Sequence, residues 1–204
     1  MNWHEWMGIA SGMIAAGMII PYLIAMVRGT TRPNVISWSL WTVVVFITLL
    51  AQIRAGAAWS SFLLIGTLVA NSLVLIFCMR GYGYNRFATI EKITLLCAVL
   101  AVVLWLVTSS PLLAMICALT ADSVAYLPTF VKIIRYPYSE TAWYWAALVG
   151  ADLLALYSVT QIIPTNILFP IVYGALNALI LITLALVRNA HILHLFGGRH
   201  PKQK

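Results

Sequence analysis

The sequence predicts an all-α membrane protein with seven transmembrane helices, arranged as two parallel three-helix bundles joined by one linker helix. Two observations carry this prediction. Apolar residues make up 63% of the chain and charged residues 8%, whereas a soluble domain carries about 25% charged residues. In addition, the landmarks of the first three apolar spans return in the last three, in the same order and at similar spacing.

The apolar stretches have the length that a membrane span needs. Crossing about 30 Å of hydrocarbon takes roughly 20 helical residues, because each residue adds about 1.5 Å. Stretches of this length fill nearly the whole chain, at residues 5–27, 34–53, 58–79, 91–108, 110–134, 140–162 and 165–188. The predicted units are a first bundle (1–80), a loop with the linker helix (81–109), a second bundle (110–190) and a basic tail (191–204).

Lysine and arginine lie almost entirely on one side of the predicted spans. With the N-terminus outside, Arg54 is the one residue among the 12 Lys and Arg that falls outside. Basic residues concentrate in cytoplasmic loops, so this distribution predicts an N-out, C-in orientation. The same topology accounts for the net charge of +7, and no nucleic-acid partner is expected.

Pro21 and Pro128 occupy matching places, each about six residues before the cytoplasmic end of its span. Proline removes a backbone hydrogen bond and clashes with the preceding helical turn, so each helix should kink there. A static kink that improves packing is one interpretation. A matched pair at one depth favours a pair of hinges.

Each loop that follows these two spans contains a proline, Pro33 or Pro137, with a tryptophan eight residues later, Trp41 or Trp145. A tryptophan near the end of a membrane helix is typical of an interfacial anchor. The paired spacing would also let one ring from each bundle stack on the flat apolar face of a ligand. Both interpretations stay open.

Asn71 and Asn177 lie near the middle of the third and seventh spans. A buried amide has to find hydrogen-bonding partners, and asparagine often supplies such bonds between membrane helices. Two amides at matching depth in two bundles can also converge on one ligand. We therefore take them as candidate substrate-binding residues.

Asp122 and Asp152 are two of the five acidic residues, and each lies about twelve residues from a helix end. An acidic side chain inside a membrane is costly and is by default a functional-site hypothesis. Neither has an acidic counterpart in the first bundle. They either couple function to protons or another cation, or are neutral carboxyl groups bonded to a neighbouring helix.

Nothing in the sequence indicates catalysis. There is no Ser/His/Asp set and no glycine-rich phosphate loop, so neither an enzyme nor a cofactor is expected. His191 and His194 lie three residues apart, but a solvated tail helix explains them better than a metal site. Three cysteines lack paired spacing, which argues against a disulfide or zinc site.

The order of these features resembles the PQ-loop superfamily, which includes the SWEET sugar transporters and proton-coupled lysosomal amino-acid exporters. The resemblance rests on the segments from Pro21-Tyr22 to Arg28 and from Pro128-Thr129 to Arg135, together with the topology of the full chain. It implies a fold of three, one and three helices, N-out and C-in. It also implies hinge roles for the two prolines.

The same resemblance implies roles for three further positions. Asn71 and Asn177 match the family's paired substrate-contacting asparagines, and Asp152 lies where proton-coupled members carry an aspartate. The chain departs from the family pattern at Tyr22 and Thr129, which stand where the motif has glutamine. The second and sixth spans also lack the second proline pair of SWEET transporters, so sugars are only one candidate substrate.

These features together predict a transporter or facilitator of a small polar solute, with proton coupling as an option, in a bacterial inner membrane. The solute and the lipid bilayer are the expected partners, and the sequence is also compatible with a homo-oligomer. The alternative is a non-transporting receptor or assembly protein. A polar cavity lined by Asn71 and Asn177 would favour transport, and a dry apolar interface there would favour the alternative.

Overall fold

The computed structural model describes residues 2–197 apart from 30, 31, 34, 86–88, 90, 91, 94, 97, 98, 101, 102, 104–106, 108, 109, 139 and 141. Helices are the regular elements of this described part. They are α1 (Trp3–Gly17), α2 (Ile19–Val27), α3 (Val35–Arg54), α4 (Ser61–Phe77), the π-helical turn η1 (Cys78–Tyr82), α6 (Pro111–Ala125), α7 (Leu127–Arg135), α8 (Ala142–Tyr157) and α9 (Pro164–Gly197).

Several of these helices have the length and composition of membrane spans. Four long apolar segments meet both criteria: Trp3–Val27, Ser61–Tyr82, Met115–Arg135 and Pro164–Asn189. Trp38–Arg54 and Ala142–Tyr157 are apolar but shorter. The long apolar helices indicate a membrane-embedded protein. The predicted span 91–108 falls largely outside the described residues.

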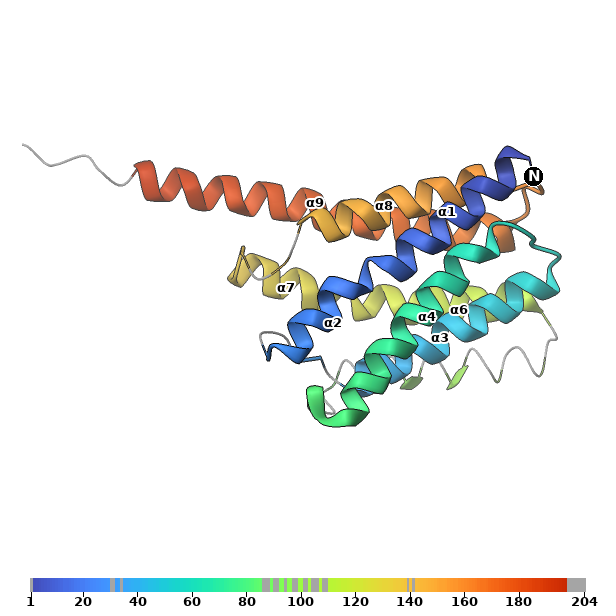
Figure 1. Cartoon of the computed structure of the whole chain (residues 1–204), viewed down its shortest axis with the longest axis horizontal. Coiled ribbons are helices and arrows are strands. Elements are labelled where there is room, and N and C mark those ends of the chain that lie inside the picture. Colours follow the sequence, from blue (N-terminus) through green and yellow to red (C-terminus); the bar gives the residue numbers. More distant parts are fainter. Residues whose placement is uncertain are drawn as a thin grey trace, which may run out of the picture.

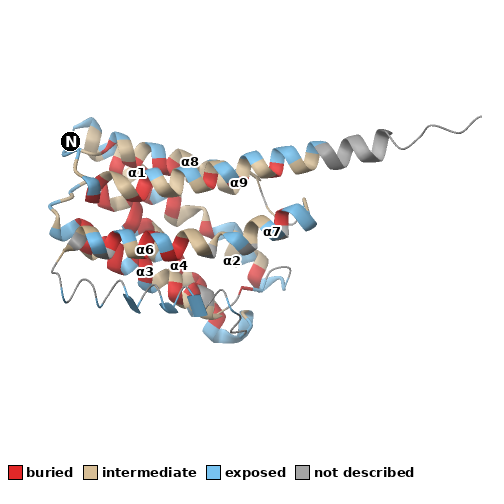
Figure 2. Cartoon of the chain, turned by 180° about the vertical axis from the view of Figure 1, so that it is seen from behind, coloured by how far each residue is buried: buried red, intermediate tan, exposed pale blue. Residues whose placement is uncertain are grey.

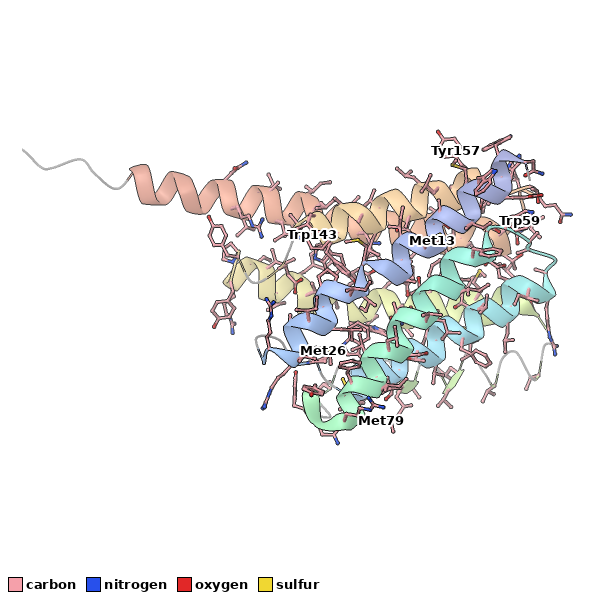
Figure 3. The ribbon with its side chains drawn as sticks, viewed as in Figure 1. Met13, Met26, Trp59, Met79, Trp143 and Tyr157 are labelled. Atoms are coloured by element: carbon pink, nitrogen blue, oxygen red, sulfur yellow. The ribbon has the colours of Figure 1, made fainter. Side chains whose placement is uncertain are left out.

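The helices run roughly along one common direction (Figure 1). Helix α1 lies against α4 and α8, α3 lies against α4 and α6, and α8 lies against α9. The N-terminus, Trp59 and Tyr157 lie at one end of the bundle, and Met26 and Met79 lie toward the other (Figures 1 and 3). Helix α9 projects well past the bundle at that second end, so the predicted tail begins inside a helix.

Helices α1 and α6 begin in the same manner. The side chain of Asn2 accepts a 3.1 Å hydrogen bond from the backbone of Glu5, and Ser110 accepts one of 3.5 Å from Leu113. Such caps satisfy backbone N–H groups that have no partner within the helix. Helix α6 also has Pro111 at its first position, where a missing N–H costs nothing.

The helices that contain Pro21 and Pro128 are both interrupted just before the proline, whereas α9 continues through Pro170 without a break. The break between α1 and α2 falls at Met18, three residues before Pro21, and the break between α6 and α7 falls at Tyr126, two residues before Pro128. Proline has no N–H to donate to the carbonyl four residues earlier. The two interruptions fall where this hydrogen bond is missing, but the unbroken course of α9 shows that a proline does not force a break by itself.

Helices α1 and α4 approach each other through glycine. A Cβ atom on Gly12 would meet the backbone oxygen of Phe62, and one on Gly66 would meet the backbone of Gly12 itself. Gly8 faces the backbone oxygen of Trp59 in the same manner. Small residues let membrane helices pack at backbone distance, so α1 and α4 behave as one closely packed pair.

Buried residues gather on the sides of the helices that face one another (Figure 2). The largest buried cluster joins residues from distant parts of the chain, including Ala15, Leu64, Met115, Ala151 and Phe169. Large apolar side chains also cover the outer surface, such as Ile20 on α2 and Ile182 on α9. This outer surface is apolar, as contact with lipid requires.

Candidate functional site

A cavity of about 110 Å³ lies between the N-terminal and C-terminal helices. Its volume is many times the ~10–15 Å³ that one water molecule needs. Helices α1 to α4, the α6–α7 break and helices α7 to α9 all contribute to its wall. The lining residues are Ala15, Ile19, Trp38, Trp41, Val45, Leu63, Thr67, Ala70, Asn71, Tyr126, Thr129, Tyr144, Trp145, Leu148, Asp152, Phe169, Tyr173 and Asn177.

Asn71 and Asn177 face this same cavity from the two halves of the chain. Asn71 is on α4 and Asn177 is on α9, and both side chains are buried. Asn71 lies ten residues after the start of α4 and Asn177 thirteen after the start of α9, which corresponds to about 15–20 Å along each helix. The two amides thus lie deep between the helix ends.

Asn177 is the middle member of a short hydrogen-bond chain. The hydroxyl of Tyr126 donates to Asn177 Oδ1 at 3.0 Å. Asn177 Nδ2 donates in turn to Asp152 Oδ2 at 2.9 Å. The chain links the α6–α7 break to α9 and α8, and Asp152 is 3% exposed. The buried carboxyl group of Asp152 therefore belongs to the cavity wall.

A glycine on α9 lets α8 come close at this point. A Cβ atom added to Gly174 would lie 3.2 Å from the Cβ atom of Asp152. That distance is tighter than ordinary van der Waals contact, so a larger residue would press directly on Asp152. The small residue at position 174 helps to hold Asp152 within hydrogen-bonding reach of Asn177.

Asp122 occupies a different place from Asp152. It is 1% exposed, and neither carboxyl oxygen has a hydrogen-bond partner in the described part of the chain. It is not among the described residues that line the cavity. It lies one helical turn before Tyr126, where the hydrogen-bond chain begins. The structure therefore does not bring the two candidate coupling residues into one site.

Aromatic rings form much of the cavity wall. Trp41 and Trp145 both line it, together with Trp38. Trp38 and Trp41 meet edge to face at 5.3 Å between ring centroids, and Tyr126 meets Tyr173 in the same geometry at 6.0 Å. Such arrangements are the preferred geometry for aromatic pairs.

Trp143 differs from its neighbour Trp145. It is 52% exposed on the outside of α8 (Figure 3) and takes no part in the described cavity wall. The anchor interpretation therefore suits Trp143, whereas Trp41 and Trp145 are placed to contact a ligand.

Several cavity residues were not singled out from the sequence, among them Tyr126, Tyr144, Phe169 and Tyr173. A signal for two of them was present. Tyr173 precedes Asn177 by four residues, so both share one face of a helix. Tyr126 lies two residues before Pro128, at the break that the proline imposes. Tyr144 and Phe169 carry no comparable signal.

The two proline loops are held by similar bonds to different donors. The backbone N–H of Tyr84, just after η1, donates to the carbonyl oxygen of Pro33 at 2.9 Å. The Nε atom of Arg188 on α9 donates to the carbonyl oxygen of Pro137, also at 2.9 Å. Each loop is thereby tied to a later part of the chain.

Arg188 makes further contacts with its loop. Its Nη2 atom donates to the carbonyl oxygen of Glu140 at 2.7 Å, and its guanidinium group lies 5.4 Å from the ring centre of Tyr138. The Glu140 carboxylate accepts a 3.3 Å bond from the indole N–H of Trp145. Arg188 therefore holds the loop that orients a cavity tryptophan. From the sequence alone, Arg188 is only one of the basic residues that predict the cytoplasmic side.

A second group of polar contacts, only part of it buried, lies toward the N-terminal end of the bundle. Gln52 Nε2 donates to the carbonyl oxygen of Asn166 at 3.4 Å, and Asn166 Nδ2 donates to that of Gln161 at 3.1 Å. His4 Nδ1 donates to the carbonyl oxygen of Tyr157 at 3.0 Å, which ties the start of α1 to the end of α8. These bonds join the two halves of the chain at this end.

The described residues contain no group of three or more His, Cys, Asp or Glu that could hold a metal ion. The side chains of His191 and His194 lie outside the described part. Comparison of the chain with protein-family models, with curated proteins and with solved structures finds no match.

Proposed function

We propose that the protein is an alternating-access transporter or facilitator of a small polar solute in a bacterial inner membrane. It crosses the membrane seven times, N-out and C-in, as two three-helix bundles and a linker helix. One observation carries the proposal: Asn71 and Asn177, from helices far apart in sequence, line one cavity deep between the helix ends. Transporters built from repeats hold their substrate in such a place.

The helix breaks support a rocking motion. Each break lies close to the cavity, because Ile19 follows the first break and Tyr126 forms the second, and both line the wall. A helix that lacks a hydrogen bond at one turn bends there at lower cost. Hinges at Pro21 and Pro128 would let the cytoplasmic segments α2 and α7 move. Because these segments carry the wall residues Ile19 and Thr129, their movement would open one end of the cavity.

The glycine contacts between α1 and α4 support a rigid unit beside these hinges. Backbones in direct contact at Gly12 and Gly66 leave no room for sliding. The cavity wall on that side would then move as one body. Rocking of one bundle against the other is the motion expected of such transporters.

We place proton coupling first at Asp152, because it lines the cavity and bonds to the candidate substrate-binding residue Asn177. A proton gained or lost there changes the charge that a solute meets. Asp122 lies off the cavity and would act, if at all, through Tyr126. An assembly protein has no need for a hollow with buried amide and carboxyl groups, and a receptor has no need for helix breaks beside it, so we rank that alternative second.

Flux into lipid vesicles that contain the purified full-length protein tests the proposal. A panel of sugars, amino acids, amines and vitamins should contain a solute that enters faster than into empty vesicles. Asn71→Ala and Asn177→Ala should each slow that entry. Thr183→Ala on α9 is the control, because its hydroxyl bonds only the preceding turn of its own helix. Normal flux in both asparagine variants would refute the assigned site.

A further inference from the structure

We propose that the cavity takes an organic cation, such as a quaternary or protonated amine, whose charge faces Asp152 and whose body lies between aromatic rings. This inference rests on the proposed function, since it names the substrate class of the same site. It is carried by the chemistry of the described part of the cavity wall, which has one acidic group, no basic group and many aromatic rings.

Asp152 is the one ionisable acidic side chain in the described wall of the cavity, and the described wall contains no Lys, Arg or His. Asn177 supplies one hydrogen bond to Oδ2, which leaves the carboxyl group without a cationic partner. A carboxylate removed from water is costly unless an opposite charge faces it. A positively charged solute would supply that charge, and an anion would be repelled.

The aromatic residues of the wall favour the same class of ligand. Six of them carry an indole or phenol ring: Trp38, Trp41, Tyr126, Tyr144, Trp145 and Tyr173. The faces of such rings attract cations, and cages of them bind quaternary ammonium groups. Rings from both halves of the chain surround the space, so a cation there would meet aromatic faces on more than one side.

The remaining polar groups suit the uncharged end of such a molecule. Asn71 and Thr67 on α4 line the wall on the N-terminal side, whereas Asp152 is on α8. The hydroxyl of Thr67 bonds the carbonyl oxygen of Leu63 in its own helix. The amide of Asn71 is therefore the better group to bind a hydroxyl or carbonyl at the other end of the cation. A neutral sugar could bond to the amides but would leave the carboxyl group of Asp152 without a cationic partner.

A matched pair of probes tests the inference directly. Choline carries a trimethylammonium group, and 3,3-dimethylbutan-1-ol is its neutral carbon isostere of nearly the same shape. Calorimetric titration of the full-length protein in lipid nanodiscs compares the two. We expect choline to bind at least about tenfold more tightly than the neutral alcohol, because only choline carries a positive charge that the Asp152 carboxylate and the ring faces attract. Equal binding, or no binding of choline, would overturn the inference.

Variants assign the preference to named groups. Asp152→Asn keeps the shape and an acceptor for Asn177 but removes the charge, so it should reduce the preference for choline to the part that the aromatic rings supply. Asp122→Asn removes a buried carboxyl group that is off the cavity and should leave the preference intact. Trp41→Leu should weaken choline binding, and Trp41→Phe should restore part of it. A preference that survives undiminished in Asp152→Asn would also overturn the inference.

Failure of this inference can be told apart from failure of the transport proposal. If vesicles take up a neutral sugar or amino acid but no cation, transport stands and the cation assignment falls. If choline binds with the expected preference but no solute crosses the vesicle membrane, the ligand class stands and transport falls.

Discussion

Asn177 donates a 2.9 Å hydrogen bond to Asp152 across the α8–α9 interface. The candidate substrate-binding residue and the candidate coupling residue are thus direct partners, 25 residues apart in sequence. A change in the charge of Asp152 must alter how firmly the Asn177 amide is held. Binding of a solute and gain or loss of a proton would therefore act on the same pair of groups.

The chain of Tyr126, Asn177 and Asp152 should behave as a unit. Tyr126→Phe removes the donor to Asn177 Oδ1, and Asn177→Ala removes both bonds of the amide. Each change should lower the free energy of unfolding by about 1–3 kcal/mol, because a buried polar group loses its partner. Unfolding in mixed micelles, measured for both single variants and the double variant, should show a coupling energy of about 0.5 kcal/mol or more. Additive effects would show that the bond between Tyr126 and Asn177 contributes nothing to stability.

Transport should respond to a pH gradient through Asp152. We expect an imposed gradient to change solute flux in the unmodified protein and Asp152→Asn to flatten that response, because an amide cannot gain or lose a proton. Flux is measured in vesicles with the internal and external pH set separately. Asp122→Asn is the matched control and should keep more of the response. A full response in Asp152→Asn would place the coupling residue elsewhere.

Arg188 should control transport through Trp145. Arg188→Gln removes the positive charge and the paired bonds to the carbonyl oxygens of Pro137 and Glu140, so Trp145 loses its fixed position. We expect a higher KM for solute flux and faster proteolysis within 136–141. Arg188→Lys should recover little, since lysine cannot reproduce the fork of the guanidinium group.

The exposed residue Arg80 provides the control for the two Arg188 variants. Arg80→Gln should leave both the KM for solute flux and the rate of proteolysis unchanged. An unaltered KM in Arg188→Gln would limit Arg188 to a structural role.

Two glycines should respond to alanine in opposite ways. Gly66→Ala forces a Cβ atom against the backbone of Gly12 and should lower the free energy of unfolding by about 1–3 kcal/mol. Gly150 in α8 has no atom within 4 Å of an added Cβ. There alanine should raise stability by up to about 1 kcal/mol, through its better helix propensity. Thermal unfolding in one detergent compares the two variants.

The orientation of the chain is testable by labelling. Met79 is 77% exposed in η1, at the end of the bundle opposite to the N-terminus (Figure 3). In intact cells, Met79→Cys should react with an impermeant maleimide only after permeabilisation, whereas Asn2→Cys should react at once. The reverse pattern would invert the proposed N-out, C-in topology.

Local features of the sequence were sufficient for part of this structure. Runs of apolar residues indicate membrane helices, because the bilayer imposes one length and one polarity on every span. The helix breaks at Met18 and Tyr126 lie within one turn of Pro21 and Pro128, where the sequence predicts kinks. The depth of Asn71 and Asn177 follows from counting residues along a helix of known rise.

Only the tertiary structure decided which residues meet. Asp122 and Asp152 are equivalent by depth, yet Asp152 faces the cavity and Asp122 does not. Trp143 and Trp145 must lie on different faces of α8, because they are two residues apart on a helix, but only the packing decided that Trp145 is the one that faces the cavity. The direction in which a helix faces depends on its contacts with neighbouring helices, and in an apolar chain no polar stripe marks the buried side. For this reason the sequence by itself determined depth, whereas the packing of α8 against α9 decided that Asp152 bonds to Asn177.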